Sequence, residues 1–205
     1  MRALALLLLL PLCGCSSLVE QRVDHLATAQ IASDFDTYSI KRVGILPPLG
    51  RGFDLHQTDA LQGIVFTEFS QQAPYEFVPL KQHDLEEVVL NESYVRGAFE
   101  PAMIIELARR FHFDAMLVVT VIEGKIHDPQ RIALSADLVA SETGAAIWSG
   151  SVRLDASSDR VRNALEAFYD SSGSTEIEGG GGWELALHSP RMFAQFAAWQ
   201  LAQLL

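Results

Sequence analysis

The most constraining feature of the sequence is a series of three strand-like segments in the second half of the chain. The segment 115–126 ("AMLVVTVIEGKI") begins with a continuous apolar half, which is typical of a strand buried on both faces. The segment 131–141 alternates apolar and polar residues, and 145–156 follows it after the turn-forming "ETG" at 142–144. We therefore expect an antiparallel meander whose first strand is central in the sheet.

Apolar residues recur at helical spacing on both sides of this meander. Pro101 fits the first turn of a helix over 101–111, and Ser189 followed by Pro190 fits the start of a last helix that runs to the C-terminus. Further helices are expected over 58–72 with Thr58 or Asp59 as the cap, within 81–97, and over 157–170.

Two shorter strands are expected earlier in the chain, at 38–48 and 75–80, each closed by proline. Because strands and helices are partly interleaved, the sequence predicts an α/β fold with a single mixed β-sheet and helices packed on it, an α/β sandwich. Residues 38–205 are expected to form one domain, in which the Ser- and Gly-rich segment 171–182 is a flexible loop and the last helix closes the chain.

The N-terminus has the order of a secretory signal. Arg2 precedes an apolar run from Ala3 to Leu12, which is shorter than the roughly 20 residues that span a membrane. The end of the run, Leu12-Cys13-Gly14-Cys15, resembles the bacterial lipobox. That resemblance implies that residues 1–14 are a lipoprotein signal peptide, and that Cys15 becomes the first residue of the mature protein and carries the lipid, including palmitate. A plain signal peptide and an uncleaved anchor are the alternatives.

The segment that follows the lipobox is polar with scattered aliphatic residues. We expect residues 15–37 to be the lipid anchor and a tether that leads away from the membrane. Ser16, rather than Asp, follows the lipidated position, so the periplasmic face of the outer membrane is the expected location.

Composition and motif searches argue against most kinds of chemistry. The net charge of −11 repels phosphate backbones, so nucleic acid is not an expected partner. Ser149 and Ser151 lie on an expected strand and do not match a nucleophile elbow. The carboxylates Glu86 and Glu87 are adjacent in sequence, which does not suit an acid/base pair. The glycines of "EGGGGWE" do not match a phosphate loop. The six histidines form no metal-binding motif: His25, His56, His83, His112, His127 and His188. We expect no cofactor, no metal and no enzyme activity.

Three phrases of the sequence resemble a group of periplasm-facing bacterial domains. They are "KRVGILPP", "ELARRFHFDAMLVVTVIEG" and "LSADLVASETGAAIWSGSV", and together they fall within residues 38–155. The group includes the curli-export lipoprotein CsgG, the flagellar lipoprotein FlgO, the exopolysaccharide-export lipoprotein PelC and the N-terminal domain of TolB. Where the group usually has Gly-Ala before the long strand, this chain has His112-Phe113.

The resemblance implies a non-enzymatic envelope component, in which copies often assemble side by side into rings. A structural or export-accessory lipoprotein, working through oligomer and partner contacts, is therefore the favoured interpretation. The last helix is apolar over more than one face, which makes Phe193, Phe196, Trp199 and Leu201 a candidate interface with a second copy. The alternative for Trp199 is that it completes the monomer core, as packing is also expected for Trp148.

Two other functions are also compatible with the sequence. One is an outer-membrane lipoprotein activator of a cell-wall synthase, as in LpoB, although the 21 polar residues 16–36 are few for that span. The other is a hydrolase with an unrecognised site.

Overall fold

The computed structural model describes residues 23–50, 55–89, 101–171 and 182–205. The lipobox with Cys15, the first part of the expected tether and most of the expected loop 171–182 lie outside these residues. No helix within the described ranges is long and apolar enough to cross a membrane.

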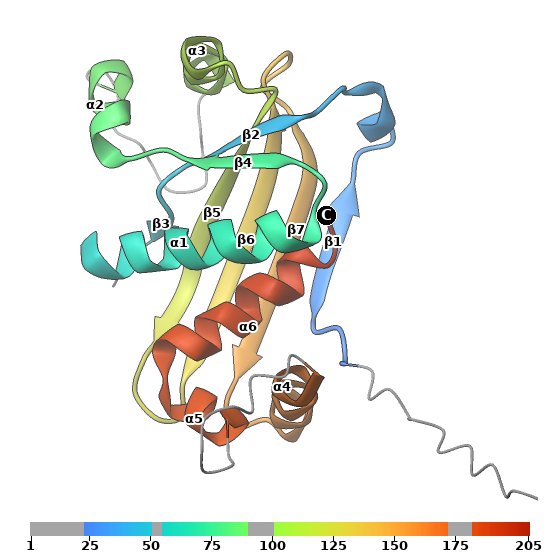
Figure 1. Cartoon of the computed structure of the whole chain (residues 1–205), viewed down its shortest axis with the longest axis vertical. Coiled ribbons are helices and arrows are strands. Elements are labelled where there is room, and N and C mark those ends of the chain that lie inside the picture. The colour runs from blue at the N-terminus through green and yellow to red at the C-terminus, as the bar shows by residue number, and fades with distance from the viewer. Residues whose placement is uncertain (1–22, 51–54, 90–100, 172–181) are drawn as a thin grey trace, which may run out of the picture.

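The strands form one mixed sheet in the order β1-β7-β6-β5-β2-β4, with a short β3 that pairs with β5 beyond the end of β2 (Figure 1). β5, β6 and β7 are the antiparallel meander that the sequence predicts, whereas β2 lies parallel to both β5 and β4. The strand bounds are β1 (Ala27–Ile31), β2 (Arg42–Ile45), β3 (Leu49–Gly50), β4 (Glu76–Pro79), β5 (Ala115–Lys125), β6 (Arg131–Ala140) and β7 (Ala146–Asp155). The predicted fold class is confirmed.

The central position of β5 follows from its two apolar faces. Leu117 and Val119 belong to the larger of two apolar clusters, and Met116 and Val118 belong to the smaller one on the opposite face. All four side chains are at most 1% exposed. A strand covered on both faces has no place for a polar residue, which explains the continuous apolar run.

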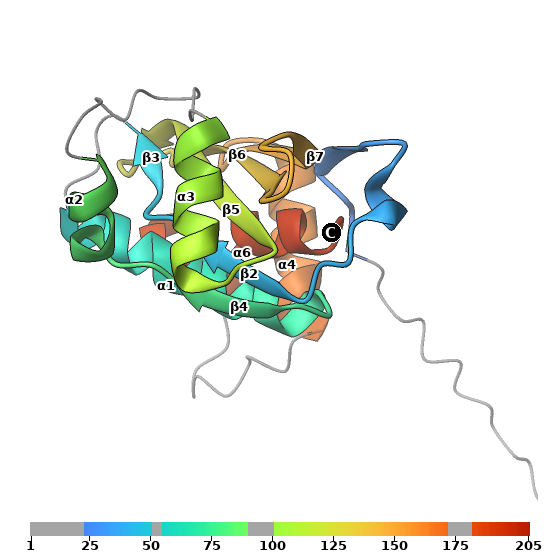
Figure 2. The same ribbon diagram turned by 90° about the horizontal axis from the view of Figure 1, so that it is seen from above.

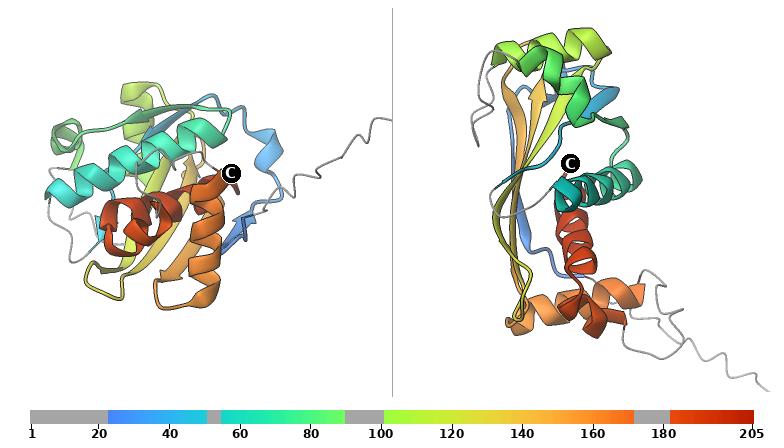
Figure 3. Two further views of the ribbon diagram at one scale, coloured as in Figure 1. Left: turned by 60° about the horizontal axis from the view of Figure 1, so that its bottom comes forward. Right: turned by 90° about the vertical axis from the view of Figure 1, so that its left-hand side faces the viewer.

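Helices cover the sheet in two groups. α1 (Leu55–Gln72) and α6 (Pro190–Ala202) lie across one face, as the right-hand view of Figure 3 shows. α2 (Gln82–Val89) and α3 (Pro101–Phe111) lie near one end of the sheet (Figure 2), where α3 packs on the smaller cluster. α4 (Asp159–Ser171) and α5 (Gly182–His188) lie near the other end (Figure 1).

α6 begins where its sequence predicts. The Ser189 hydroxyl accepts a hydrogen bond from the backbone N–H of Met192, and Pro190 occupies the first turn, where a missing N–H costs nothing. The helix contacts α1, α5, β6, β7 and β1 of its own chain. These contacts within one chain account for the apolar residues on more than one face of α6, and no second copy is needed to cover them.

Three expectations about element boundaries are wrong. Residues 27–31, expected in the tether, form β1 and pair with β7, so the domain begins before residue 38. α1 begins at Leu55, so Thr58 and Asp59 lie inside the helix and do not cap it. α5 is a further helix that begins at Gly182, within the expected loop. A single-turn 3₁₀ helix over Phe35–Thr37 follows β1.

Candidate functional site

The interface expected on the last helix is not available in this structure. Phe193, Phe196 and Leu201 are between 0% and 2% exposed and belong to the larger apolar cluster of the same chain. The structure corrects the sequence interpretation here, because side chains buried in the monomer cannot also meet a second copy. Trp148 is likewise a core residue, 1% exposed, and its indole N–H donates to the carbonyl of Leu204 at 2.8 Å.

Trp199 is the partly exposed member of the expected interface. Its ring lies 4.9 Å from that of Phe168 and 6.2 Å from that of Phe196, measured between centroids. On its other side it stacks on the imidazole of His25 at 6.4 Å, with 4° between the planes. Both α4 and the segment before β1 therefore pack against Trp199, which favours its role in the monomer core.

The segment before β1 is fixed to the domain by polar contacts. The Gln200 amide, fully buried on α6, accepts from the backbone N–H of Leu26 at 2.8 Å and donates to the carbonyl of Asp24 at 2.9 Å. Arg160 on α4 also forms an exposed ion pair with Asp24 at 3.4 Å. The chain is therefore held against the fold from residue 24 onward, and only residues before it can act as a tether.

β1 is the first strand in the sheet order, and no other described strand pairs with its outer side. Ala32 donates to the carbonyl of Ile147 at 2.9 Å, so by the alternation of antiparallel pairing Gln30 also faces β7, and Ala29 and Ile31 direct their backbone groups outward. The strand "ATAQI" contains no charge, no proline and no bulge, which are the features that usually block strand addition. Ile31 is 61% exposed at the end of this edge.

The opposite edge of the sheet, β4, is protected. Its last residue, Pro79, has no N–H to donate, and the exposed Glu76 carries a charge paired with Arg42 at 3.2 Å. The two edges therefore differ, and β1 is the edge to which another strand can add.

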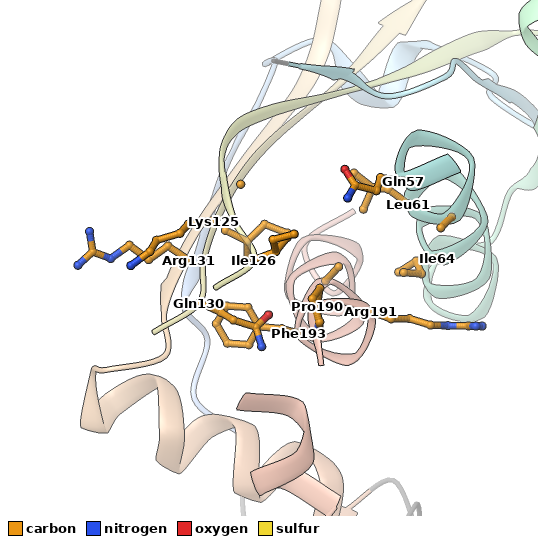
Figure 4. Close-up of a pocket in the computed structure, with 14 residues that line it drawn as sticks. Gln57, Leu61, Ile64, Lys125, Ile126, Gln130, Arg131, Pro190, Arg191 and Phe193 are labelled. Atoms are coloured by element: carbon orange, nitrogen blue, oxygen red, sulfur yellow. The ribbon is translucent and has the colours of Figure 1, made fainter. Parts of the chain in front are cut away.

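A pocket of about 220 Å³ lies where α1, the start of α6 and the connection between β5 and β6 meet (Figure 4). Leu61 and Ile64 line it from α1, Phe193 from α6, and Ile126 and Ile132 from the β5–β6 side. Sequence reasoning missed this pocket, because its walls come from three segments that are far apart in the chain.

The side chains considered for catalysis do not converge. The Ser149 hydroxyl donates to Asp137 at 2.6 Å and Ser151 contacts Thr28 at 3.2 Å, both on the sheet face away from α6, and neither pair contains an imidazole. His83 and His188 pair with Asp84 and Asp128. No group of three or more His, Cys, Asp and Glu side chains that could hold a metal occurs in the described ranges. Glu86, Glu87 and His56 lie in helices, but their side chains are outside the description.

One buried carboxyl group was not singled out from the sequence. Glu68 on α1 is 3% exposed and accepts a hydrogen bond from the Gln195 amide on α6 at 2.9 Å. Burial raises the pKa of the Glu68 carboxyl, and the Gln195 hydrogen bond offsets part of that rise. Burial, with the nearby Glu68 charge, also raises the pKa of Tyr169 to about 12. Glu68 on α1 and Tyr169 on α4 each form a hydrogen bond with α6, so these side chains link the three helices.

No protein-family model matches the sequence, and no curated protein sequence matches it significantly. Among solved structures, the PelC dodecamer from Paraburkholderia phytofirmans matches with a TM-score of 0.46 and 10% identity, over 71% of this chain and 92% of that chain. Lipoprotein GNA1162 from Neisseria meningitidis matches with a TM-score of 0.43 and 22% identity, over 66% and 98%. The LpoB C-terminal domain from Salmonella enterica matches with a TM-score of 0.38 and 18% identity, over 58% and 86%. These scores are too low to assign a family or a function to this chain.

Proposed function

We propose that this chain is a bacterial envelope lipoprotein, anchored through Cys15 to the periplasmic face of the outer membrane, that works through protein contacts and not through catalysis. The observation that carries the proposal is Leu12-Cys13-Gly14-Cys15 at the end of a signal-length apolar run. The resemblance of three sequence phrases to the group that includes PelC and CsgG supports the same role, that of a structural or export-accessory component.

The length of the tether restricts where the domain can work. The first residue of the described fold, Val23, follows Cys15 by eight residues, and Asp24 is already held by Gln200. Eight residues reach at most about 29 Å when fully extended. An anchor at Cys15 therefore keeps the domain beside the membrane surface. An activator of a cell-wall synthase, the alternative function, would need a longer reach, and the position of β1 makes the tether shorter than the sequence suggests.

The anchor is tested by separating the two cysteines. Cys15→Ser should leave an unprocessed precursor and abolish palmitate labelling, whereas the matched variant Cys13→Ser, which alters a residue of the signal peptide, should be processed and labelled as the parent is. Normal processing and labelling of Cys15→Ser would overturn the proposal.

The β1 edge is the surface best suited to association between copies of the lipoprotein. The edge offers outward backbone groups and an exposed Ile31, whereas three of the four residues first expected to form the interface, Phe193, Phe196 and Leu201, are buried in the core. Confinement of anchored copies to the plane of the membrane raises their effective concentration, so weak lateral contacts suffice.

Light scattering tests this surface on a version that begins at Ser16, which retains every described residue. We expect a dimer or larger assembly at high protein concentration that Ile31→Lys weakens and Trp199→Ala, at equal folded fraction, does not. A parent that remains monomeric at all concentrations, or an assembly that Trp199→Ala alone disrupts, would contradict the assignment to β1.

A further inference from the structure

Residues 24–32, here called the strap, include β1 and lie at the outer edge of the sheet (Figure 1). The strap buries little apolar surface. Leu117 and Val119 in the central strand are at most 1% exposed, whereas Ala27, the buried residue of the strap, is 8% exposed. The exposed residues of the strap are Asp24, His25, Thr28, Gln30 and Ile31. The hydrophobic effect therefore holds the strap more weakly than it holds the meander.

Polar contacts hold the first part of the strap. The Gln200 amide, 0% exposed on α6, bonds twice to the strap backbone, at the N–H of Leu26 (2.8 Å) and the carbonyl of Asp24 (2.9 Å). Asp24 also pairs with Arg160 at 3.4 Å, and the two side chains are 65% and 67% exposed. A hydrogen bond within a protein replaces one to water, and solvent screens an exposed ion pair, so each contact adds little net free energy. These contacts fix the position of the strap without holding it strongly.

The rest of the core is joined without the strap. α1 packs on α6, and the ring of Phe69 on α1 meets that of Trp148 on β7 at 6.3 Å between centroids. The strap meets this assembly from outside, at β7, at α6 and at Arg160 on α4. Segments with exposed hydrogen bonds and few buried apolar contacts open at a lower free energy than the core does.

We propose that the strap is a releasable segment, which leaves β7 and α6 as one cooperative unit while α1, α6 and the meander stay folded. The first residue after the strap that packs on the larger apolar cluster is Phe35, which follows Cys15 by 20 residues. Release therefore raises the greatest reach from a lipid at Cys15 from about 29 Å to about 72 Å. This change in reach rests on the proposed anchor, whereas the release itself does not.

A pull on the anchor favours release. The tether enters the strap at Asp24, so a force from the membrane acts first on the contacts with Gln200 and Arg160. A partner that holds the domain away from the membrane would shift the population toward the released form. The longer reach is the one that an activator of a cell-wall synthase, the alternative function, requires.

Native-state hydrogen exchange on the version that begins at Ser16 tests the release. The N–H groups of Gln30 and Ala32 face β7, at the end of the strap far from Gln200. Because they open without the core, we expect protection factors about tenfold or more below those of the β6 amides. Gln200→Leu removes two hydrogen bonds at the near end only, and should lower the protection of Gln30 and Ala32 by one common factor of about ten.

Two outcomes of this experiment would overturn the proposal. One is parent protection of Gln30 and Ala32 as high as that of β6, which would mean that the strap opens only when the whole domain unfolds. The other is parent-like protection of both amides in Gln200→Leu, which would mean that the two ends of the strap open independently.

A disulfide supplies the matched control. The version that begins at Ser16 has no native cysteine, because the two in the chain precede it. Thr28 and Ser151 lie directly opposite each other in the β1–β7 register, with their hydroxyl oxygens 3.2 Å apart. Thr28→Cys with Ser151→Cys can therefore join the strap to β7 on oxidation. Ser135→Cys with Ser151→Cys joins β6 to β7 instead and leaves the strap free.

Oxidation of the Thr28→Cys, Ser151→Cys variant should raise the protection of Gln30 and Ala32 about tenfold or more and abolish the effect of Gln200→Leu, and reduction should reverse both changes. Oxidation of the β6–β7 pair should leave these two amides at the parent value. Unchanged protection after the strap is closed would overturn the proposal. None of these results bears on lipidation of Cys15.

Discussion

Phe113 donates its backbone N–H to the carbonyl of Ala108 at 2.9 Å, and this bond closes the C-terminus of α3 around His112. The pattern is a Schellman motif, in which the residue after the helix adopts the left-handed conformation. His112 has a φ of 57°, and Phe113 packs into the smaller apolar cluster together with Ala108. The position at which the resembling group usually has glycine is therefore one that favours glycine on physical grounds.

His112→Gly is expected to raise the free energy of unfolding by about 0.5–1 kcal/mol, because glycine adopts this backbone conformation without strain. Arg110→Gly, two residues earlier and inside α3, should lower it by about 1 kcal/mol. Urea denaturation of both variants measures the difference. Destabilisation by His112→Gly would mean that the His112 side chain contributes more than its backbone strain costs.

Val119→Asp should unfold the domain. Val119 is 1% exposed in the middle of β5, and a carboxylate there would have no partner, at a cost of about 3–5 kcal/mol. Ile122→Asp, on the same strand but 50% exposed, is the matched control and should remain folded. Circular dichroism melting compares the two, and a Val119→Asp variant that melts like the parent would show that β5 is not central to stability.

Gln200→Leu should release the segment before β1. The leucine cannot satisfy the N–H of Leu26 or the carbonyl of Asp24, so a loss of about 1–3 kcal/mol and faster amide hydrogen exchange in β1 are expected. Gln203→Leu removes an exposed bond to Gln72 from the same end of the chain and should have little effect. Unchanged exchange in β1 would show that other contacts hold this segment.

Glu68→Gln should stabilise the protein at neutral pH. Because burial raises the pKa of Glu68 in the folded state above its unfolded value, folding favours the protonated form, and stability falls as pH rises from the unfolded pKa of about 4.5 through the higher folded pKa. Glutamine removes this cost, so the gain should be present at neutral pH and absent below the unfolded pKa. Melting temperatures across this range, with the exposed Glu184→Gln as the control, measure it; a gain that is the same at all pH values would exclude ionisation as its cause.

Much of the fold could be predicted because long elements carry strong patterns. The alternation of Ile132, Leu134 and Ala136 against Ser135 and Asp137 predicts β6 and its buried face, and the structure confirms it. The Ser189-Pro190 pair predicts the start of α6 for a local reason, since a cap depends on residues adjacent in sequence.

What could not be predicted depends on contacts between distant segments. β1 is five residues long and contains two alanines, so its apolar face is too weak to distinguish it from a polar tether. The pairing of β2 between β4 and β5 has no local signal either. The apolar surface of α6 is visible in the sequence, but whether α1, α5 and the sheet cover it, or a second copy does, is decided only by the tertiary arrangement.

The mass of the N-terminal peptide is a direct test of the lipid anchor at Cys15. Trypsin cleaves after Arg22, so the mature protein from bacterial membranes should give the peptide 15–22. If Cys15 is the lipidated N-terminus, this peptide begins at Cys15 and carries the mass of a diacylglyceryl group on its sulfur. A peptide 15–22 with an unmodified cysteine, a peptide that begins at another residue, or one that retains Cys13 would contradict it.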